Sequence, residues 1–247
     1  MDPLHQFQIQ RYLPINIGGL DASFSNSALY MVITVALITG LIVYGMRGRA
    51  LVPSRMQSLA ELFYEFVANL VRDNAGPDAR KYFPFVFSLF MFIMVGNLIG
   101  LVPGTFTFTS HIIVTFGLAL TVFVFVTLLG LIKHGFHFFS LFMPSGVPMA
   151  LAPILIPIEI LSYLSRPVSL SIRLFANMMA GHTMLKVFGG FSVLLGGALG
   201  GLGYTVGILP LVINIALVGF EILVAMLQAY VFTILTCLYI RDALELH

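Results

Sequence analysis

The chain has 247 residues, of which 59% are hydrophobic and only 9% are charged, and its mean hydropathy is +1.03. A water-soluble domain of this composition would expose too much apolar surface, and a net charge of +2 does not indicate a nucleic-acid partner. The only cysteine, Cys237, excludes an internal disulfide, and we expect it to pack as a small apolar residue. Composition therefore predicts an all-α integral membrane protein, with one membrane domain over residues 1–247.

The first two predicted elements differ in kind. Residues 28–46 form an uncharged run that is long enough to cross a bilayer. Residues 54–75 are amphipathic: Ser54 and Gln57 have the spacing of a helix N-cap, apolar residues recur with helical spacing, and Gly76-Pro77 is a helix stop. We expect this second helix to lie in the membrane interface.

Two more apolar runs, residues 82–102 and 112–132, predict a helical hairpin of two spans. A Thr-rich turn joins them. Lys133 then begins a predicted loop that extends to Gly146.

The last two apolar segments are unusually long. Residues 148–188 number 41 and residues 204–240 number 37, which as helices would measure about 60 and 55 Å. Because the hydrocarbon core is only about 30 Å thick, each segment either breaks into two shorter helices or lies strongly tilted. Pro157 and Pro167 favour kinks, and the glycine-rich stretch 189–203 predicts a turn between the segments.

Basic residues orient the chain. Apart from Arg11, the segments on one side of the five predicted crossings carry no Lys or Arg. The positive-inside rule therefore places the N-terminus outside and His247 on the cytoplasmic (or matrix) side. The basic residues assigned to the inner side are Arg47, Arg49, Arg55, Arg72, Arg80, Lys81, Lys133 and Arg241.

Arg173 lies within a long segment that is otherwise largely apolar. A guanidinium stays charged at physiological pH, and placing one at mid-membrane depth costs about 2.5–3.5 kcal/mol on insertion scales. The cost indicates a function for a fixed positive charge at that depth. The alternative is an arginine that reaches the interface or forms a structural ion pair.

Polar residues form a row on each long segment. Glu159, Arg166 and Arg173 are seven residues apart, a spacing that drifts by only about 20° per step, and Ser169 and Asn177 lie near the same face. Such rows on neighbouring helices can be interhelical hydrogen-bonding sites, each worth about 0.6 kcal/mol, or can mark an ion or proton path.

The second segment repeats this spacing in Asn214, Glu221 and Gln228, so the two rows can face each other. His182 could then meet Glu221, and a His beside a carboxylate suits proton relay. The alternative is a buried, hydrogen-bonded His without a role in transfer. No metal-ligand spacing and no phosphate-binding glycine motif occur, so we expect no metal, nucleotide or other cofactor.

Four stretches resemble one family. The run SLSIRLFANMMAGH (169–182) closely resembles the signature of subunit a of F-type ATP synthases, and EILVAMLQAYVF (221–232) resembles the last helix of that family. PLHQF (3–7) and GNLIGLVP (96–103) are also similar to it. The resemblance covers nearly the whole chain.

This resemblance implies a non-catalytic stator subunit beside a rotating ring of c subunits, with peripheral-stalk b-type subunits and the remainder of the ATP synthase as further partners in the lipid membrane. It implies two long tilted helices, and an Arg173 that faces the ring carboxylate and separates two aqueous half-channels. Carried over by position, the outer half-channel is lined or bordered by Asn177, His182, Asn214, Glu221 and Gln228, and Ser169 and Glu159 lie toward the cytoplasmic one.

One departure concerns the titratable pair. Many bacterial members of the family have an acid at the position of His182 and a histidine at that of Glu221, whereas this chain has the exchanged pair, as mitochondrial-like members do. The resemblance thus implies a bacterial inner (plasma) membrane, with the mitochondrial inner membrane as the alternative. A secondary transporter and a structural membrane scaffold are the rival interpretations; the first would favour an internal inverted repeat, which we do not find.

Overall fold

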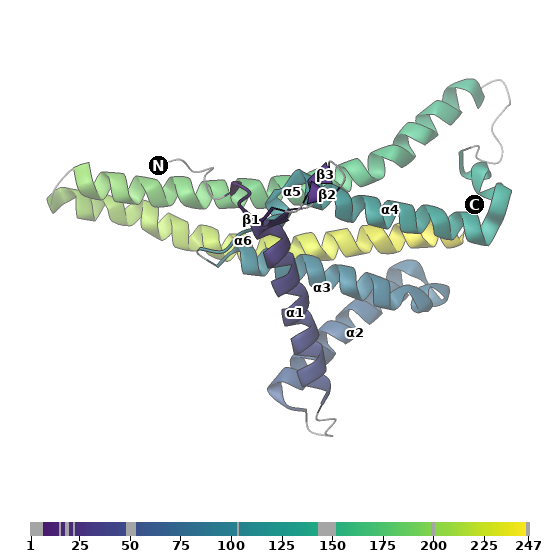
Figure 1. Ribbon diagram of the computed structural model, residues 1–247, viewed down its shortest axis with the longest axis horizontal. Helices are drawn as coiled ribbons and strands as arrows, with labels where there is room; N and C mark the ends of the chain where they lie inside the picture. Colours follow the sequence, from purple (N-terminus) through teal and green to yellow (C-terminus); the bar gives the residue numbers. More distant parts are fainter. Residues whose placement is uncertain are drawn as a thin grey trace. The chain divides into compact units, whose positions relative to one another are not determined.

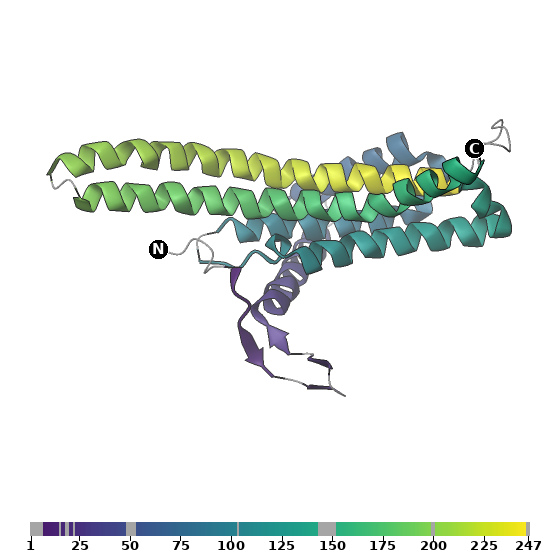
Figure 2. The same ribbon diagram turned by 90° about the horizontal axis from the view of Figure 1, so that it is seen from above.

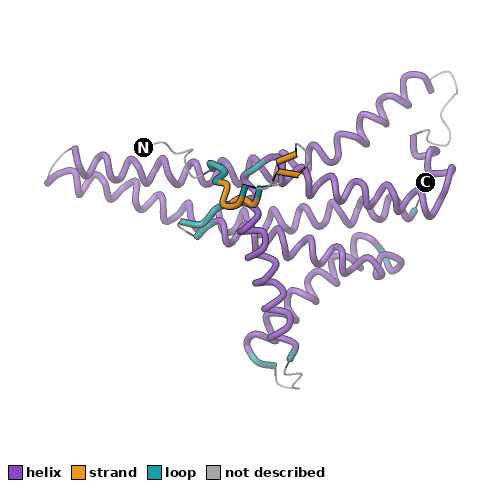
Figure 3. Tube along the Cα trace, viewed as in Figure 1, coloured by secondary structure: helices purple, strands orange, loops and turns teal. Residues whose placement is uncertain are grey.

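The computed structural model describes residues 7–14, 16–17, 20–21, 23–47, 53–102, 104–142, 152–198 and 201–245. Almost all of the described chain is helical, and its strands lie near the N-terminus (Figure 3). The prediction of an all-α membrane protein is confirmed, because five helices in the described ranges are long and apolar enough to cross a membrane. The described residues form six α-helices: α1 (Asn26–Met46), α2 (Arg55–Ala75), α3 (Phe83–Gly100), α4 (Ile112–His134), α5 (Ala152–Ala198) and α6 (Gly201–Leu244).

Packing divides the chain into two compact units, and α1, α3, α5 and α6 each contribute to both (Figure 1). The first unit contains Met1–Thr39, Met91–His111 and Leu174–Ala229. The second contains Gly40–Phe90, Ile112–Arg173 and Tyr230–His247. Within each unit α5 and α6 lie side by side (Figures 1 and 2).

Short strands before α1 were not predicted from the sequence. β1 (Arg11–Leu13) pairs antiparallel with β4 (Phe24–Ser25), and β2 (Asn16–Ile17) pairs with β3 (Leu20–Asp21). Two hydrogen bonds of Asn26 connect this segment to the start of α1. The side-chain oxygen of Asn26 accepts one from the backbone N–H of Gln10 at 3.2 Å, and its side-chain amide donates one to the carbonyl of Gln8 at 3.1 Å.

The amphipathic helix α2 begins and ends as predicted. Ser54 Oγ accepts a hydrogen bond from the N–H of Gln57 at 3.3 Å. Gly76 ends the helix with a φ of +81°, a conformation that disfavours residues with a Cβ. One face packs within the second unit, where the rings of Phe66 and Phe90 lie 5.5 Å apart. Its location in the membrane interface stays a prediction.

Two predicted connections are helical instead. The prediction of a turn over residues 189–203 was wrong for most of that stretch, because α5 continues to Ala198 and α6 already begins at Gly201. The two helices approach closely beside this stretch: Ser192 Oγ donates to the carbonyl of Gly207 at 2.8 Å, and a Cβ on Gly207 would lie 3.0 Å from the carbonyl oxygen of Ser192.

The predicted loop after Lys133 is a 3-10 helix, η4 (Gly135–Phe142), as far as Phe142. Two other 3-10 helices are η2 (Pro77–Tyr82) and η3 (Phe108–Ser110). The ring of Phe138 in η4 packs over Gly130 of α4, where a Cβ would lie 2.5 Å from the ring. Residues 143–151 lie outside the described residues.

α5 and α6 are each one helix, of 47 and 44 residues, which corresponds to about 70 and 66 Å. Of the two alternatives left by their length, this excludes a break into two separate helices. α5 bends in the part that contains Pro157 and Pro167 (Figure 1). The tilt of the two helices relative to a membrane stays a prediction.

Apolar side chains fill both units. The fully buried large residues include Met91, Phe108, Leu174 and Met178 in the first unit, and Val67, Val86, Val122, Leu170, Phe232 and Ile240 in the second. Cys237 is buried and free, which confirms its predicted packing as a small apolar residue.

Candidate functional site: polar pairs between α5 and α6

In the first unit, two polar pairs connect α5 to α6. Nδ1 of His182 lies 3.7 Å from Oε1 of Glu221, and these residues are only 8% and 3% exposed. The side-chain amide of Asn177 donates to Oε1 of Gln228 at 2.7 Å. The predicted proximity of His182 and Glu221 is therefore confirmed.

A missing side chain brings the carboxylate of Glu221 close to α5. A Cβ on Gly181 would lie 2.5 Å from Oε1 and 2.8 Å from Cδ of Glu221, which is closer than any ordinary contact. Glycine at this position therefore leaves the space that the carboxylate occupies beside His182.

Asn214 is the third member of the predicted row on α6. It is partly buried, and a Cβ on Gly189 of α5 would lie 3.6 Å from its side-chain nitrogen. All three members of the row, Asn214, Glu221 and Gln228, thus face α5.

The Thr-rich connection between α3 and α4 supplies polar groups that the sequence analysis missed. Oγ1 of Thr107 lies 3.0 Å from Nε2 of His182 and also donates to the carbonyl of Gly100 at 3.2 Å. The ring of Phe7 meets the His182 ring edge-on, with centroids 6.4 Å apart. The imidazole is therefore held on both sides. The sequence pattern that could have indicated this contact is the group of Thr residues in the turn between the two spans.

Asn97 of α3 connects the turn before α4 to α6 through hydrogen bonds. It is fully buried, accepts a hydrogen bond from Oγ1 of Thr109 at 2.8 Å, and donates to the carbonyl of Ala225 at 3.5 Å. Ala225 lies one helical turn after Glu221, so this network positions the part of α6 that carries the carboxylate. Nearby, burial lowers the pKa of His111, which stacks on Phe106 with centroids 5.1 Å apart.

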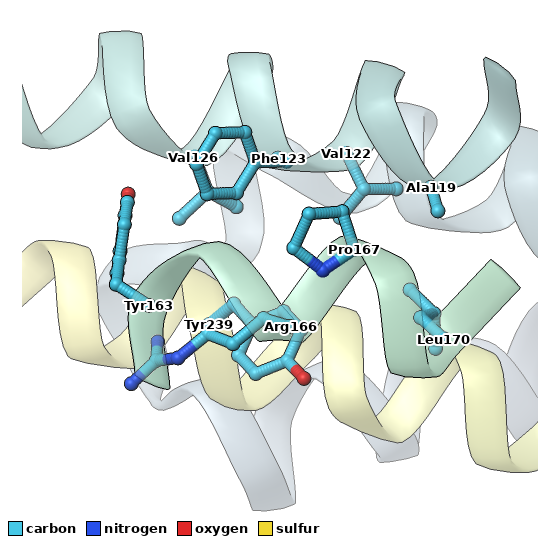
Figure 4. A pocket seen from close by; sticks show the side chains of 9 residues that line it. All are labelled: Ala119, Val122, Phe123, Val126, Tyr163, Arg166, Pro167, Leu170 and Tyr239. Carbon is cyan, nitrogen blue, oxygen red and sulfur yellow. The ribbon is translucent and has the colours of Figure 1, made fainter. Parts of the chain in front are cut away.

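In the second unit, Arg166 lies between two tyrosine rings, 5.3 Å from the centroid of Tyr163 and 5.0 Å from that of Tyr239. Its guanidinium also pairs with Asp242 at 3.2 Å. Side chains of α4, α5 and α6 line a cavity of about 10 Å³ beside it (Figure 4), which has room for about one water molecule. Arg166 therefore joins α5 to the end of α6 and is not a free charge.

The other predicted residues of α5 are more accessible. Arg173 and Ser169 are exposed, and Glu159 is partly exposed. Arg173 interacts electrostatically with Tyr239. Within the described part of the chain, no acidic side chain forms an ion pair with Arg173, and no group of three or more His, Cys, Asp or Glu side chains could hold a metal ion.

Fold and polar residues together define a multi-pass helical membrane protein that carries ionisable groups inside its longest helices. Comparison with known proteins places it more narrowly. A family model described as ATP synthase A chain matches residues 28–241, and the chain belongs to this family. The resemblance seen in the sequence is thereby confirmed.

Relatives match over nearly their whole length. ATP synthase subunit a of Parvibaculum lavamentivorans is 60% identical over 99% of this chain and 94% of the relative. The subunit a proteins of Chelativorans sp. and Mesorhizobium japonicum are 58% and 56% identical, again over 99% of this chain and over 98% and 97% of the relatives. The chain is thus a membrane-sector subunit, and ATP synthesis and proton transport follow from the family.

Proposed function

We propose that this chain is the proton-conducting stator subunit of an F-type ATP synthase. It supplies two half-channels that lead from the two membrane surfaces to the carboxylates of a c-subunit ring, and Arg173 separates them. The observation that carries the proposal is the buried pair of His182 and Glu221 between α5 and α6. Because the similar relatives are bacterial, we assign it to the bacterial inner (plasma) membrane.

The burial of Glu221 supports proton exchange. Neither of its carboxylate oxygens has a hydrogen-bond partner among the described residues. An ionised, unpaired carboxylate in an apolar site is costly, whereas a carboxyl that gains and loses a proton beside an imidazole is not permanently charged. His182 at 3.7 Å is the nearby proton acceptor.

Asn177 and Gln228 extend the polar path. Gln228 is seven residues from Glu221 on α6, about 10 Å along the helix axis. The pair is neutral, so it can hydrogen-bond water or a hydronium ion without holding a proton itself. We assign Asn177, Gln228 and Asn214, together with His182 and Glu221, to the outer half-channel.

The proposal gives Arg173 a partner on another subunit. Its side chain is exposed, and the same part of α5 also exposes the apolar residues Val168 and Ile172, at 44% and 48%. Such a surface suits another membrane subunit that presents a carboxylate. Arg173 then stabilises the ionised form of the arriving ring carboxylate and repels protons, so a proton cannot pass directly between the half-channels.

This separation couples proton flow to rotation. Each proton that descends 100 mV releases about 2.3 kcal/mol, and only travel around the ring converts that energy into rotation. Ser169 and Glu159 border the cytoplasmic half-channel in this proposal. The subunit itself catalyses no synthesis of ATP, needs no cofactor, and works with the c-ring, the b-type stalk subunits, membrane lipid and the rest of the complex.

The test replaces Arg173 in the complete complex. We expect Arg173→Ala to abolish ATP synthesis and ATP-driven proton pumping while the complex assembles, and to let protons leak passively through vesicles. Arg173→Lys should also be poor, since lysine lacks the planar array of donors and its ammonium is more strongly hydrated. Arg72→Ala, which changes an exposed arginine on α2, is the control. Near-normal coupled synthesis in Arg173→Ala would refute the proposal.

A further inference from the structure

Thr107 touches the proposed relay without belonging to the polar rows of α5 and α6. It precedes η3, is 6% exposed, and its Oγ1 lies 3.0 Å from Nε2 of His182. Its role follows from counting protons on this hydroxyl and on the imidazole.

The hydroxyl of Thr107 has one proton to donate. We assign that proton to the carbonyl of Gly100, 3.2 Å away, because this buried carbonyl at the end of α3 accepts no other hydrogen bond within the described residues. With this assignment the hydroxyl oxygen accepts a hydrogen bond from His182, so Nε2 of the imidazole carries a hydrogen. In the neutral ring the other nitrogen, Nδ1, then has the free lone pair, and Nδ1 is the atom that faces Glu221 at 3.7 Å.

The position of Thr107 is fixed from two directions. Its backbone carbonyl accepts from Oγ of Ser110 at 2.6 Å. Its side chain lies directly against Gly100, where a Cβ would come within 2.5 Å of Oγ1. The hydroxyl oxygen is therefore held within hydrogen-bond distance of both Gly100 and His182.

We propose that Thr107 is a positioning residue that fixes the Nε2–H tautomer of His182, so that the Nδ1 lone pair points at Glu221. The proposal rests on the function proposed above for the pair of His182 and Glu221. It assigns one ring atom to the relay: Nδ1 takes up and releases the proton, and Nε2 keeps its hydrogen throughout.

The transfer step balances. The O–H bond of the neutral Glu221 carboxyl breaks and an N–H bond forms at Nδ1, which leaves a carboxylate beside an imidazolium. Transfer of the Nδ1 proton to a water molecule of the proposed outer half-channel then restores the neutral ring. The bond from Nε2–H to Thr107 serves both states, so the hydroxyl need not reorient. Because 3.7 Å is too long for a direct hydrogen bond, the step needs a small approach of the carboxylate or one bridging water.

The opposite tautomer would block this step. With hydrogen on Nδ1, the neutral ring could only donate toward Glu221 and could not take its proton. The contact with Thr107 thus decides whether His182 can act as a base toward Glu221.

Three variants of the complete complex, reconstituted in liposomes, separate this role from a merely structural one. Thr107→Val removes the hydroxyl at nearly constant shape, and we expect ATP-driven proton pumping to fall at least about tenfold. Thr107→Ser keeps a hydroxyl and should restore most of the activity. Thr105→Val is the matched control, because the hydroxyl of Thr105 has the backbone carbonyls of Ile99 and Val102 as its acceptors, at 2.6 and 2.7 Å.

A direct readout is ¹⁵N solid-state NMR of the histidine rings, with the signals of His182 identified by their loss in His182→Gln. We expect a neutral His182 with hydrogen on Nε2 in the unmodified complex. Hydrogen on Nδ1 would overturn the proposal, as would unchanged pumping in Thr107→Val or a Thr107→Ser variant as poor as Thr107→Val. This spectrum decides the tautomer even if Thr107→Val fails to assemble.

The same experiments distinguish this inference from the function on which it rests. Normal pumping in both His182→Ala and Glu221→Ala would refute a relay through the pair, whatever the tautomer. Impaired pumping in those two variants together with normal pumping in Thr107→Val would leave the relay intact and refute the role of Thr107.

Discussion

Gly181 leaves the space in which the carboxylate of Glu221 lies, so Gly181→Ala tests the site by adding one methyl group. The new Cβ would lie 2.5 Å from Oε1, about 0.9 Å closer than the 3.4 Å at which ordinary contact begins. The atoms that it meets are at the end of a flexible side chain. We therefore expect the carboxylate to swing away from α5 while the two helices stay together.

The expected loss follows from this displacement. Moving Oε1 directly away by about 0.9 Å lengthens its separation from Nδ1 of His182 from 3.7 Å to about 4.6 Å. A misplacement of about 1 Å in a reacting pair can cost about 100-fold in rate, so we expect proton pumping to fall by about 10- to 100-fold. If the helices separated instead, overpacking would cost about 1–3 kcal/mol and would reduce the amount of assembled complex.

The assay is ATP-driven acidification of liposomes that contain the purified complex, normalised to assembled complex. Gly190→Ala on the same helix is the matched control, because a Cβ there meets nothing within 4 Å. Both changes replace a helical glycine by alanine and so give a similar intrinsic gain in helix stability. Pumping in Gly181→Ala equal to that in Gly190→Ala, at equal assembly, would show that the position of the Glu221 carboxylate does not matter for transport.

Two further predictions concern the relay pair and the topology. We expect His182→Ala and Glu221→Ala each to slow proton-driven ATP synthesis while the complex still assembles. Because the two buried side chains face each other at 3.7 Å, the double exchange His182→Glu with Glu221→His should recover more activity than either single exchange. Additive single effects, measured in a double-mutant cycle, would indicate two uncoupled residues. The distribution of basic residues predicts that position 247 and the 47–81 segment are cytoplasmic and that position 2 is outside. Labelling of single-cysteine variants with an impermeant thiol reagent checks this topology. Labelling of positions 2 and 247 from the same side would contradict it.

Much of the fold follows from local sequence patterns. Long uncharged runs predict the five helices that can cross a membrane, because a bilayer leaves backbone groups no partners except those within a helix. Ser54 and Gly76 mark the ends of α2, where a side-chain cap and a positive φ are local requirements. The glycine-rich stretch after Phe188 was misjudged, because packing of α5 against α6 outweighs the low helix propensity of glycine there.

The candidate site was likewise predictable from the sequence only in part. Regular seven-residue spacing placed Asn214, Glu221 and Gln228 on one face of α6, and the structure places that face against α5. Spacing did not reveal that Arg166 pairs with Asp242, 76 residues later in the chain. It also gave no role to Thr107, whose contact with His182 spans 75 residues.

The sequence by itself determined the class of protein, the number of long apolar helices, the charge of Arg173 and the polar rows of α5 and α6, because these depend on composition and helical periodicity. Tertiary structure alone decided which polar atoms meet: the 3.7 Å approach of His182 to Glu221 through the space at Gly181, and the hydroxyl of Thr107 on the far side of the ring. Such pairings join segments that are distant in the chain, and no local pattern encodes their distances or the atom that carries the proton.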